Sequence, residues 1–258
     1  KNITRDDIIH YKNSHYLTSN AVVTVAGNVD SEKTFKKIEK AFSKMPQGTK
    51  LDKLNVKEVQ GRPQARFKKK AVDQTHLRVG VRGYNMFDER RYALTVLQTI
   101  LGGNWSSRLW NELREKRGLT YYVRAFQENY TDSGYLMAAA GVPHDKLTET
   151  AEKMIDVFRA VRKNGVTEAE IKFAKEYMRG SMALAFESTD EIATFLSSQE
   201  LFYNKIMMPE DVLAKIEKVK RSEILAVARD IFKPERINLA AISPGDNTKV
   251  FEKILSKI

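Results

Sequence analysis

The side chains most often used for metal binding and proton transfer are few in this 258-residue sequence, and none is spaced for either task. There is no cysteine, which excludes disulfides, thiolate zinc sites and cysteine nucleophiles. The four histidines are His10, His15, His76 and His144, and none belongs to a His-x-x-x-His or His-x-x-Glu-His pair. His10 and His15 are five residues apart, which places them on different faces of a helix. The sequence therefore predicts no metal site.

Carboxylate pairs occur where helices are predicted to start, at Asp88–Glu89, Glu168/Glu170 and Glu210–Asp211. Negative charge at a helix start complements the helix dipole, so we interpret these pairs as structural. The sequence also lacks a Gly-x-Ser-x-Gly elbow, a phosphate-binding loop and a dinucleotide fingerprint.

One segment, residues 101–122, combines polar and aromatic side chains at a predicted helix–strand junction. Arg114 falls in the last turn of the predicted helix, and Tyr121 falls just beyond Gly118, where a strand begins. A guanidinium and a phenol at this junction could donate hydrogen bonds to carbonyl oxygens of a bound peptide. The structural alternative is that Arg114 helps to end the helix, where a cation is favourable, while Tyr121 only packs. Spacing alone favours the structural alternative and leaves the functional interpretation open.

The net charge is +11, from 44 lysines and arginines against 33 aspartates and glutamates. This balance favours an anionic partner, but the basic residues are spread over all predicted helices, so nucleic-acid binding remains a lesser alternative. The most apolar stretch, residues 135–142, is far shorter than the roughly 20 residues of a membrane-spanning helix. The composition is compatible with a bacterial cytoplasm or periplasm.

The predicted elements around the 101–122 segment alternate between helical and extended patterns. Apolar alternation predicts strands at 76–82, 120–127 and 134–142. Helical spacing predicts a helix ending at Gly102–Gly103, a second that Ser106 or Ser107 caps and Gly118 ends, and others over 147–164 and 167–204. The pattern Ser188-Thr-Asp-Glu191 predicts a new helix start inside the last region, and Pro209 another after it. The order predicts an α+β fold with a mostly antiparallel sheet and helices on one face.

The two ends of the chain repeat each other. A gap-free offset of 216 aligns residues 5–38 with 221–254, with identical residues at Arg5, Ile8, Asp30, Lys33, Phe35, Lys37 and Ile38. Each copy predicts a helix, a short strand, an aspartate-containing turn and an amphipathic helix, which favours a duplication. Residues 1–48 then form the tail of a first unit, 49–72 a linker that runs into an edge strand, and 73–258 a complete second unit. We expect the natural protein to begin upstream of Lys1.

The string Leu-Gly-Gly-x-x-Ser-Ser-Arg-Leu…Leu-Arg-Glu-Lys-Arg-Gly-Leu-x-Tyr, residues 101–121, resembles the C-terminal half of the insulinase/pitrilysin-type zinc peptidases, family M16, nearest to the processing-peptidase-like members. Residues 4–30 are similar to the end of that family's N-terminal half. The resemblance implies two homologous halves that enclose an unstructured peptide, with zinc in the N-terminal half. It assigns residues 1–48 to the zinc-binding half and 73–258 to the substrate-binding half.

The resemblance implies that Arg114 and Tyr121 are the pair that orients the substrate near its scissile carbonyl. The His-x-x-Glu-His motif and the distal Glu that hold zinc in the family have no counterpart here. We therefore expect the substrate-binding part of a zinc metalloendopeptidase, inactive alone, with a peptide substrate and the N-terminal half or a homologous subunit as partners. The alternatives are a non-catalytic subunit of a heterodimeric M16 peptidase and a basic nucleic-acid-binding module.

Overall fold

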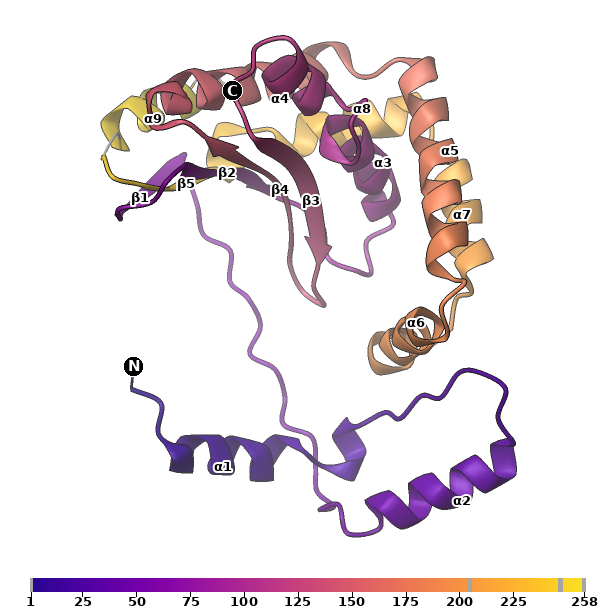
Figure 1. The fold of residues 1–258 in the computed structure, drawn as a ribbon. Coiled ribbons are helices and arrows are strands. Elements are labelled where there is room, and N and C mark those ends of the chain that lie inside the picture. Colours follow the sequence, from indigo (N-terminus) through magenta and orange to yellow (C-terminus); the bar gives the residue numbers. More distant parts are fainter. Residues whose placement is uncertain (1, 204–205, 246–247, 257–258) are drawn as a thin grey trace. The chain divides into compact units, whose positions relative to one another are not determined.

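The computed structural model describes residues 2–203, 206–245 and 248–256 (Figure 1). Contacts divide the chain into two compact units. The larger unit holds residues 56–179 and 212–258, and the smaller unit holds residues 1–55 and 180–211. Among the described residues, no helix combines the length and the apolar character that a membrane span requires.

A five-stranded sheet forms the centre of the larger unit, with the strand order β1-β5-β2-β4-β3. The strands are β1 (Gln64–Lys69), β2 (Thr75–Arg82), β3 (Tyr122–Asn129), β4 (Gly134–Val142) and β5 (Ile237–Ser243). β1 pairs with β5 in parallel, and the other three neighbouring pairs are antiparallel. The predicted α+β class with a mostly antiparallel sheet is confirmed, and β1 is an edge strand as the sequence predicts.

Figure 1 shows helices α3, α4, α8 and α9 on one side of this sheet. The helices of the unit are α3 (Arg90–Gly102), the π-helix η2 (Trp110–Glu115), α4 (Leu147–Asn164), α8 (Arg221–Ile231), α9 (Thr248–Leu255) and most of α5 (Glu168–Ala185) and α7 (Pro209–Glu217), with short 3₁₀ turns η3 (His144–Lys146) and η4 (Pro234–Arg236). In β2, Leu77, Val79 and Val81 point to the helices and are buried, whereas Arg78 is exposed. One face of the sheet therefore makes the core and the other stays open.

The smaller unit holds α1 (Arg5–His15), a 3₁₀ turn η1 (Thr18–Asn20), α2 (Ser31–Phe42) and α6 (Thr189–Phe202). Thr4 and Asp7 form a capping box at the start of α1, and Asp30 accepts a hydrogen bond from the Lys33 amide at the start of α2. The new helix predicted near Ser188 is present. The cap is not, because the Ser188 hydroxyl donates to the Asp190 carboxylate.

The first helices of the two repeated segments have equivalent boundaries, whereas α2 spans 12 residues and its counterpart α9 spans 8. α1 and α8 both span 11 residues, and their starts and ends are 216 residues apart, since 221 − 5 and 231 − 15 both equal 216. β5 has no strand counterpart, because residues 21–27 pair with no other strand in the described part of the chain. Asp246, the predicted counterpart of Asp30, lies outside the described residues.

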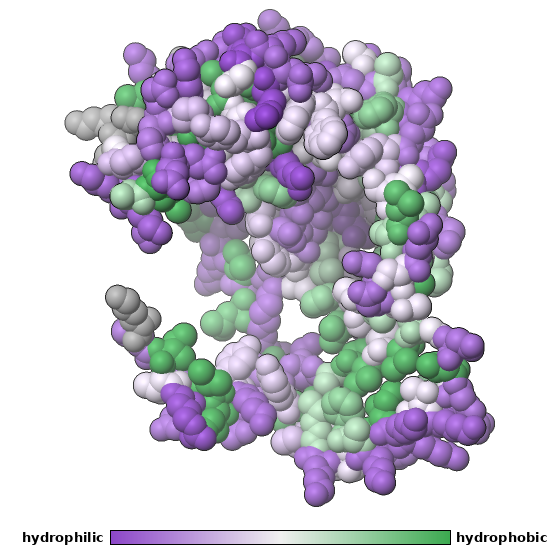
Figure 2. Space-filling model, in the orientation of Figure 1, coloured by the Kyte–Doolittle hydropathy of each residue, from purple (hydrophilic) through white to green (hydrophobic). Residues whose placement is uncertain are grey.

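Equivalent apolar residues of the repeat differ in their burial. Ile224 and Phe251 are fully buried in the core of the larger unit. Their counterparts Ile8 and Phe35 are 62% and 70% exposed. Figure 2 shows hydrophobic side chains, in green, gathered on the surface of the unit that contains α1, α2 and α6. The apolar residues of the pattern are thus buried in the core of the larger unit in one copy and exposed in the other.

Candidate functional site

Gly102 permits the end of α3 to lie close to strand β3, and Gly103 permits the chain to turn closely against the last turn of α3. A Cβ atom on Gly102 would lie 2.7 Å from the Cβ of Ala125, and one on Gly103 would lie 2.7 Å from the Cα of Thr99. Both distances are too short for real carbon atoms, so glycine permits this approach. One turn earlier, Gln98 donates from Nε2 to the Ala125 carbonyl at 2.6 Å. The chain after α3 therefore starts against the free edge of β3.

Asn104, rather than a serine, organises the turn that follows. Its side-chain oxygen accepts a hydrogen bond from the Ser106 amide at 2.9 Å. The Ser107 hydroxyl is buried and has no hydrogen-bond partner in the described part of the chain. Ser107 directly precedes the helix, and its carbonyl accepts a hydrogen bond from the Asn111 amide at 3.0 Å. The predicted side-chain cap is not formed, because the Ser107 hydroxyl makes no bond to the first helical turn and Asn104 binds an amide that lies before the helix.

The next turn is a π-helix that ends at a glycine. Leu109 and Leu113 are fully buried, and Trp110 is half-buried. Gly118 has φ +60°, and the Leu119 amide donates to the Leu113 carbonyl at 2.8 Å. This reversal sends the chain straight into β3. A π-helix widens the turn and is frequent at functional sites.

Arg114 and Tyr121 lie together at this junction. The Arg114 Nη1 donates to the carbonyl oxygens of Thr120 and Tyr121, at 2.7 and 2.6 Å. The Tyr121 amide donates to the Gly141 carbonyl at 2.8 Å, while its side chain is 61% exposed. The Arg114 side chain is also exposed, and its guanidinium carbon lies 5.6 Å from the centre of the Trp110 ring. The structure thus brings Arg114 and Tyr121 together, and the contact joins the Arg114 guanidinium to the backbone carbonyl of Tyr121.

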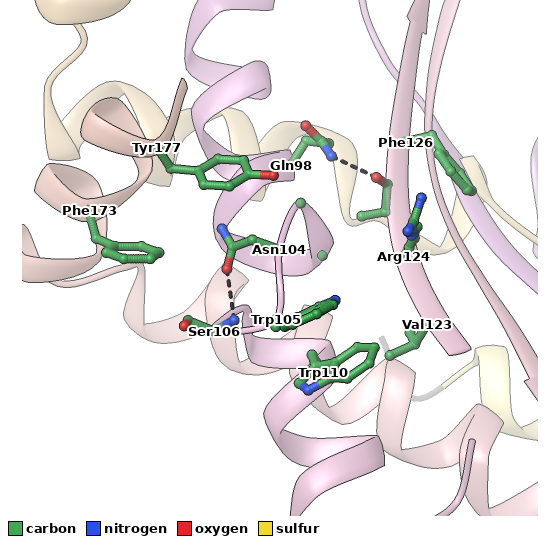
Figure 3. A pocket seen from close by; sticks show the side chains of 13 residues that line it. Gln98, Asn104, Trp105, Ser106, Trp110, Val123, Arg124, Phe126, Phe173 and Tyr177 are labelled. Carbon is green, nitrogen blue, oxygen red and sulfur yellow. Dashed lines mark hydrogen bonds between the residues drawn. The ribbon is translucent and has the colours of Figure 1, made fainter. Parts of the chain in front are cut away.

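A pocket of about 550 Å³ opens beside this junction (Figure 3). Its walls come from the loop after α3, from β3 and from α5, and its aromatic lining consists of Trp105, Trp110, Phe126, Phe173 and Tyr177. Figure 3 shows the rings of α5 on one side, across from the two tryptophans. The tryptophans stack with ring centres 6.0 Å apart. Polar groups of Gln98, Asn104 and Arg124 also line the pocket.

The pocket is suited to a bulky apolar group. Aromatic walls supply buried apolar area, and the few polar groups at the rim can orient a ligand. Trp110 belongs to the pocket and also lies beneath Arg114, so the pocket and the Arg114/Tyr121 junction adjoin. Residue-by-residue sequence reasoning missed Phe173 and Tyr177, although their four-residue spacing on one helix placed them on one face.

Arg108, in the same sequence string, has a structural task. Its Nε and Nη2 donate to the two carboxylate oxygens of Glu170 at 2.6 and 2.8 Å. The amide and hydroxyl of Thr167 donate to the same carboxylate, which forms a capping box at the start of α5. Burial opposes the charge on Glu170, but the bonds from Arg108 and Thr167 outweigh it and lower its pKa to about 2. The structural interpretation of Glu170 is confirmed.

The described residues do not provide a zinc site. No group of three or more histidine, aspartate or glutamate side chains lies close enough together in the described ranges to hold a metal ion. Both ring nitrogens of His144 are hydrogen bonded, to the Thr75 hydroxyl and the Val72 carbonyl. His76 contacts the Tyr122 hydroxyl, and His15 stacks on Tyr11. The side chains of the described residues therefore do not fit a zinc ion.

Comparison with known proteins identifies the fold. A family model described as the peptidase M16 inactive domain matches residues 2–178. The chain belongs to the peptidase M16 family. An uncharacterised zinc protease of Bacillus subtilis, YmxG, is 32% identical to this M16 chain over 242 residues. A second uncharacterised zinc protease, from Streptomyces coelicolor, is 33% identical over 251 residues. The resemblance seen in the sequence is confirmed.

The M16 chain is shorter than these relatives. Each alignment covers 94% of the chain but only 58% of the Bacillus protein and 54% of the Streptomyces protein. Among solved structures, a peptidase M16 inactive domain from Pseudomonas fluorescens superposes with a TM-score of 0.83 at 22% identity, covering 96% of the chain and 59% of that structure. A protease from Helicobacter pylori gives 0.81 at 22% identity, over 94% and 60%. These structures share the α+β fold.

Proposed function

We propose that this chain is the C-terminal, substrate-binding part of a zinc-dependent metalloendopeptidase that cleaves unstructured peptides. The observation that carries the proposal is the junction of Arg114 and Tyr121, which are exposed and adjacent at the start of the edge strand β3. Its relatives of about one-third identity are named zinc proteases. The adjoining aromatic pocket supports the proposal, because it can take an apolar side chain of a bound peptide.

In this proposal Arg114 positions Tyr121 and also binds the peptide. Nη1 is committed to the carbonyls of Thr120 and Tyr121, which holds Tyr121 at the end of the helix. The Nε and Nη2 groups of Arg114 have no protein partner within the described ranges and can donate to a peptide carbonyl. The Tyr121 hydroxyl supplies a second donor. Two donors directed at a carbonyl oxygen orient it and stabilise the charge that develops on it during attack.

The catalytic zinc and the group that activates water belong, in this proposal, to a homologous half. The donor set of the described residues does not hold a metal. The uncovered apolar face of the first repeat copy supports such a partner, because Ile8 and Phe35 are exposed where their counterparts Ile224 and Phe251 are fully buried. A homologous half that supplies a sheet would cover these residues as the larger unit covers its own.

The experiment uses the whole protein that contains both halves, with an unstructured fluorogenic peptide as substrate. Arg114→Ala and Tyr121→Phe should each lower kcat/KM by about ten-fold or more, the usual scale for losing a donor to the reacting carbonyl. Arg229→Ala and Tyr130→Phe remove an exposed arginine and an exposed tyrosine hydroxyl elsewhere and should stay within two-fold. Full activity of both site variants would contradict the assignment.

Two further measurements separate the proposal from its alternatives. Arg114→Lys keeps the charge but not the fork of donors, and unfolding midpoints show whether any loss of activity reflects loss of structure. The 258-residue chain alone should neither cleave the peptide nor retain stoichiometric zinc, and adding the other half should restore cleavage. One tightly held zinc per chain would refute the first point. A whole protein without peptidase activity would favour the non-catalytic subunit.

A further inference from the structure

The open face of the five-stranded sheet carries a row of arginines that runs across the strands. The register places Arg66 of β1 beside Ala240 of β5, Ala240 beside Arg78 of β2, Arg78 beside Ala139 of β4, and Ala139 beside Arg124 of β3. Residues paired directly across strands point to the same face. All three arginines are exposed, and the residues between them are alanines. Nothing larger than a methyl group therefore stands between the guanidinium groups.

These arginines are not neutralised within the described part of the chain. None of Arg66, Arg78 and Arg124 forms an ion pair with a carboxylate there. The same face adds Arg82, which lies 3.6 Å from Glu58, and Lys68. On the strands of this face, Glu128 is an exposed carboxylate, and it lies on β3 four residues beyond Arg124. The face therefore holds a surplus of positive charge around a row without anionic partners.

A shallow pocket lies in this face beside the arginine row. It has a volume of about 360 Å³, and its lining includes Arg66, Arg78 and Arg82 together with Gly80 and Tyr135. Gly80 lies between two of the arginines on β2 and has no side chain to fill the space. A carboxylate placed here could accept paired hydrogen bonds from a guanidinium, which is planar and carries its donors in a fork.

The spacing of the row matches an extended peptide. Neighbouring strands lie about 4.8 Å apart, so arginines on alternate strands are about 10 Å apart. A polyproline II segment rises about 3.1 Å per residue and repeats every three residues, so every third side chain points the same way at intervals of about 9 Å. Unfolded chains sample this conformation often. Carboxylates at every third position would therefore meet successive arginines.

We propose that the open face of the sheet binds an extended, acidic peptide segment through Arg66, Arg78 and Arg124. Arg124 also lines the aromatic pocket beside Trp105, so a peptide on the row reaches the pocket at its end. Only the peptide nature of the ligand rests on the proposed function. The face then selects unstructured chains with carboxylates spaced about three residues apart. Single-stranded nucleic acid, the other anionic polymer such a face could meet, is an outcome of the test.

The test measures binding to the full chain by fluorescence anisotropy, at about 50 mM salt, with a labelled peptide of four Pro-Pro-Glu repeats. This peptide should bind at least ten-fold more tightly than its Pro-Pro-Gln counterpart, and the preference should fall as salt rises. A variant with Arg66→Gln, Arg78→Gln and Arg124→Gln should lose this preference. Equal binding of both peptides by the unchanged chain would overturn the proposal.

A matched variant controls for net charge. Lys163→Gln, Arg229→Gln and Lys253→Gln remove three exposed charges from α4, α8 and α9, on the helical side of the unit. This control should keep the affinity for the acidic peptide within two-fold, and a loss equal to that of the row variant would refute a local site. Tighter binding of an oligothymidylate, lost in the row variant, would assign the face to nucleic acid instead. Neither result bears on Arg114 and Tyr121, because no cleavage is measured.

Discussion

Replacing Glu170 by glutamine should destabilise the larger unit by removing the charge that joins α5 to the segment after α3. The carboxylate accepts two bonds from Arg108 and two from Thr167, at distances from 2.6 to 2.9 Å. Glutamine keeps the size of the side chain but replaces one acceptor oxygen by a donor that faces the guanidinium. The charge-assisted fork is lost, and Arg108 is left without its carboxylate.

The structure sets the size of this effect. A pKa of about 2 in the folded chain, against 4.5 for a free glutamate, corresponds to roughly 3 kcal/mol at 1.36 kcal/mol per pH unit. Both side chains keep about a quarter of their surface in water, at 25% and 29%, and water screens the interaction. We therefore expect a loss of about 2 kcal/mol at pH 7.

The effect should depend on pH with a definite sign. Because folding lowers the pKa of Glu170, its contribution is complete above the unfolded value near 4.5 and is lost as the pH falls through about 2. The difference in unfolding free energy between the native chain and Glu170→Gln should therefore be constant above about pH 5 and shrink below pH 4.5.

Urea unfolding followed by tryptophan fluorescence measures this difference directly. Trp105 and Trp110 flank Arg108 and are the two tryptophans of the chain, so the signal reports on this unit. Glu168→Gln removes an exposed carboxylate from the same helix start and should cost less than about 0.5 kcal/mol. A Glu170→Gln effect no larger than this control, or one unchanged between pH 7 and pH 3, would refute the reasoning.

Two further predictions concern packing and a buried hydroxyl. Gly102→Ala should destabilise the chain by about 1–3 kcal/mol in urea unfolding, because the new methyl group would collide with Ala125. Gly180→Ala, at a site in α5 with nothing within 4 Å of the added carbon, should instead be neutral or stabilise by up to about 1 kcal/mol; similar losses at both sites would disprove the collision. Tyr84→Phe should cost about 1–2 kcal/mol, because the buried hydroxyl donates to Asp230 at 2.9 Å. Burial and this bond raise the pKa of Tyr84, so the loss should stay constant from pH 6 to pH 9, and a loss that varies over this range would show that Tyr84 ionises.

The secondary structure was largely predictable because the local signals were strong. Apolar alternation in residues 76–82 gave β2, and the glycine pair 102–103 ended α3 where predicted. Pro209 marked the first residue of α7. Less was predictable at the turn before η2, where the predicted serine cap is not formed and Asn104 instead accepts a hydrogen bond from the Ser106 amide. Local sequence contains several acceptors at such a turn, and only the backbone path selects one.

Arg114 and Tyr121 were singled out because residue type and a seven-residue spacing can be read from a linear pattern. Their partners could not be read in the same way. Phe173 and Tyr177 come from a helix about fifty residues further along the chain, and the Arg108–Glu170 pair joins the start of this helix to the segment after α3. The arginine row is similar, since it depends on the register of five strands that are not consecutive in sequence.

The sequence by itself determined most of the elements, the repeat and the family, because each is written in local periodicity or in a continuous string of residues. The tertiary structure alone decided which copy of the repeated pattern was covered. Residues of one repeat copy, such as Phe251, are buried, whereas their equivalents, such as Phe35, are exposed. The physical reason is that an apolar face is buried only when a second surface packs against it, and an amphipathic pattern specifies only the first of these surfaces.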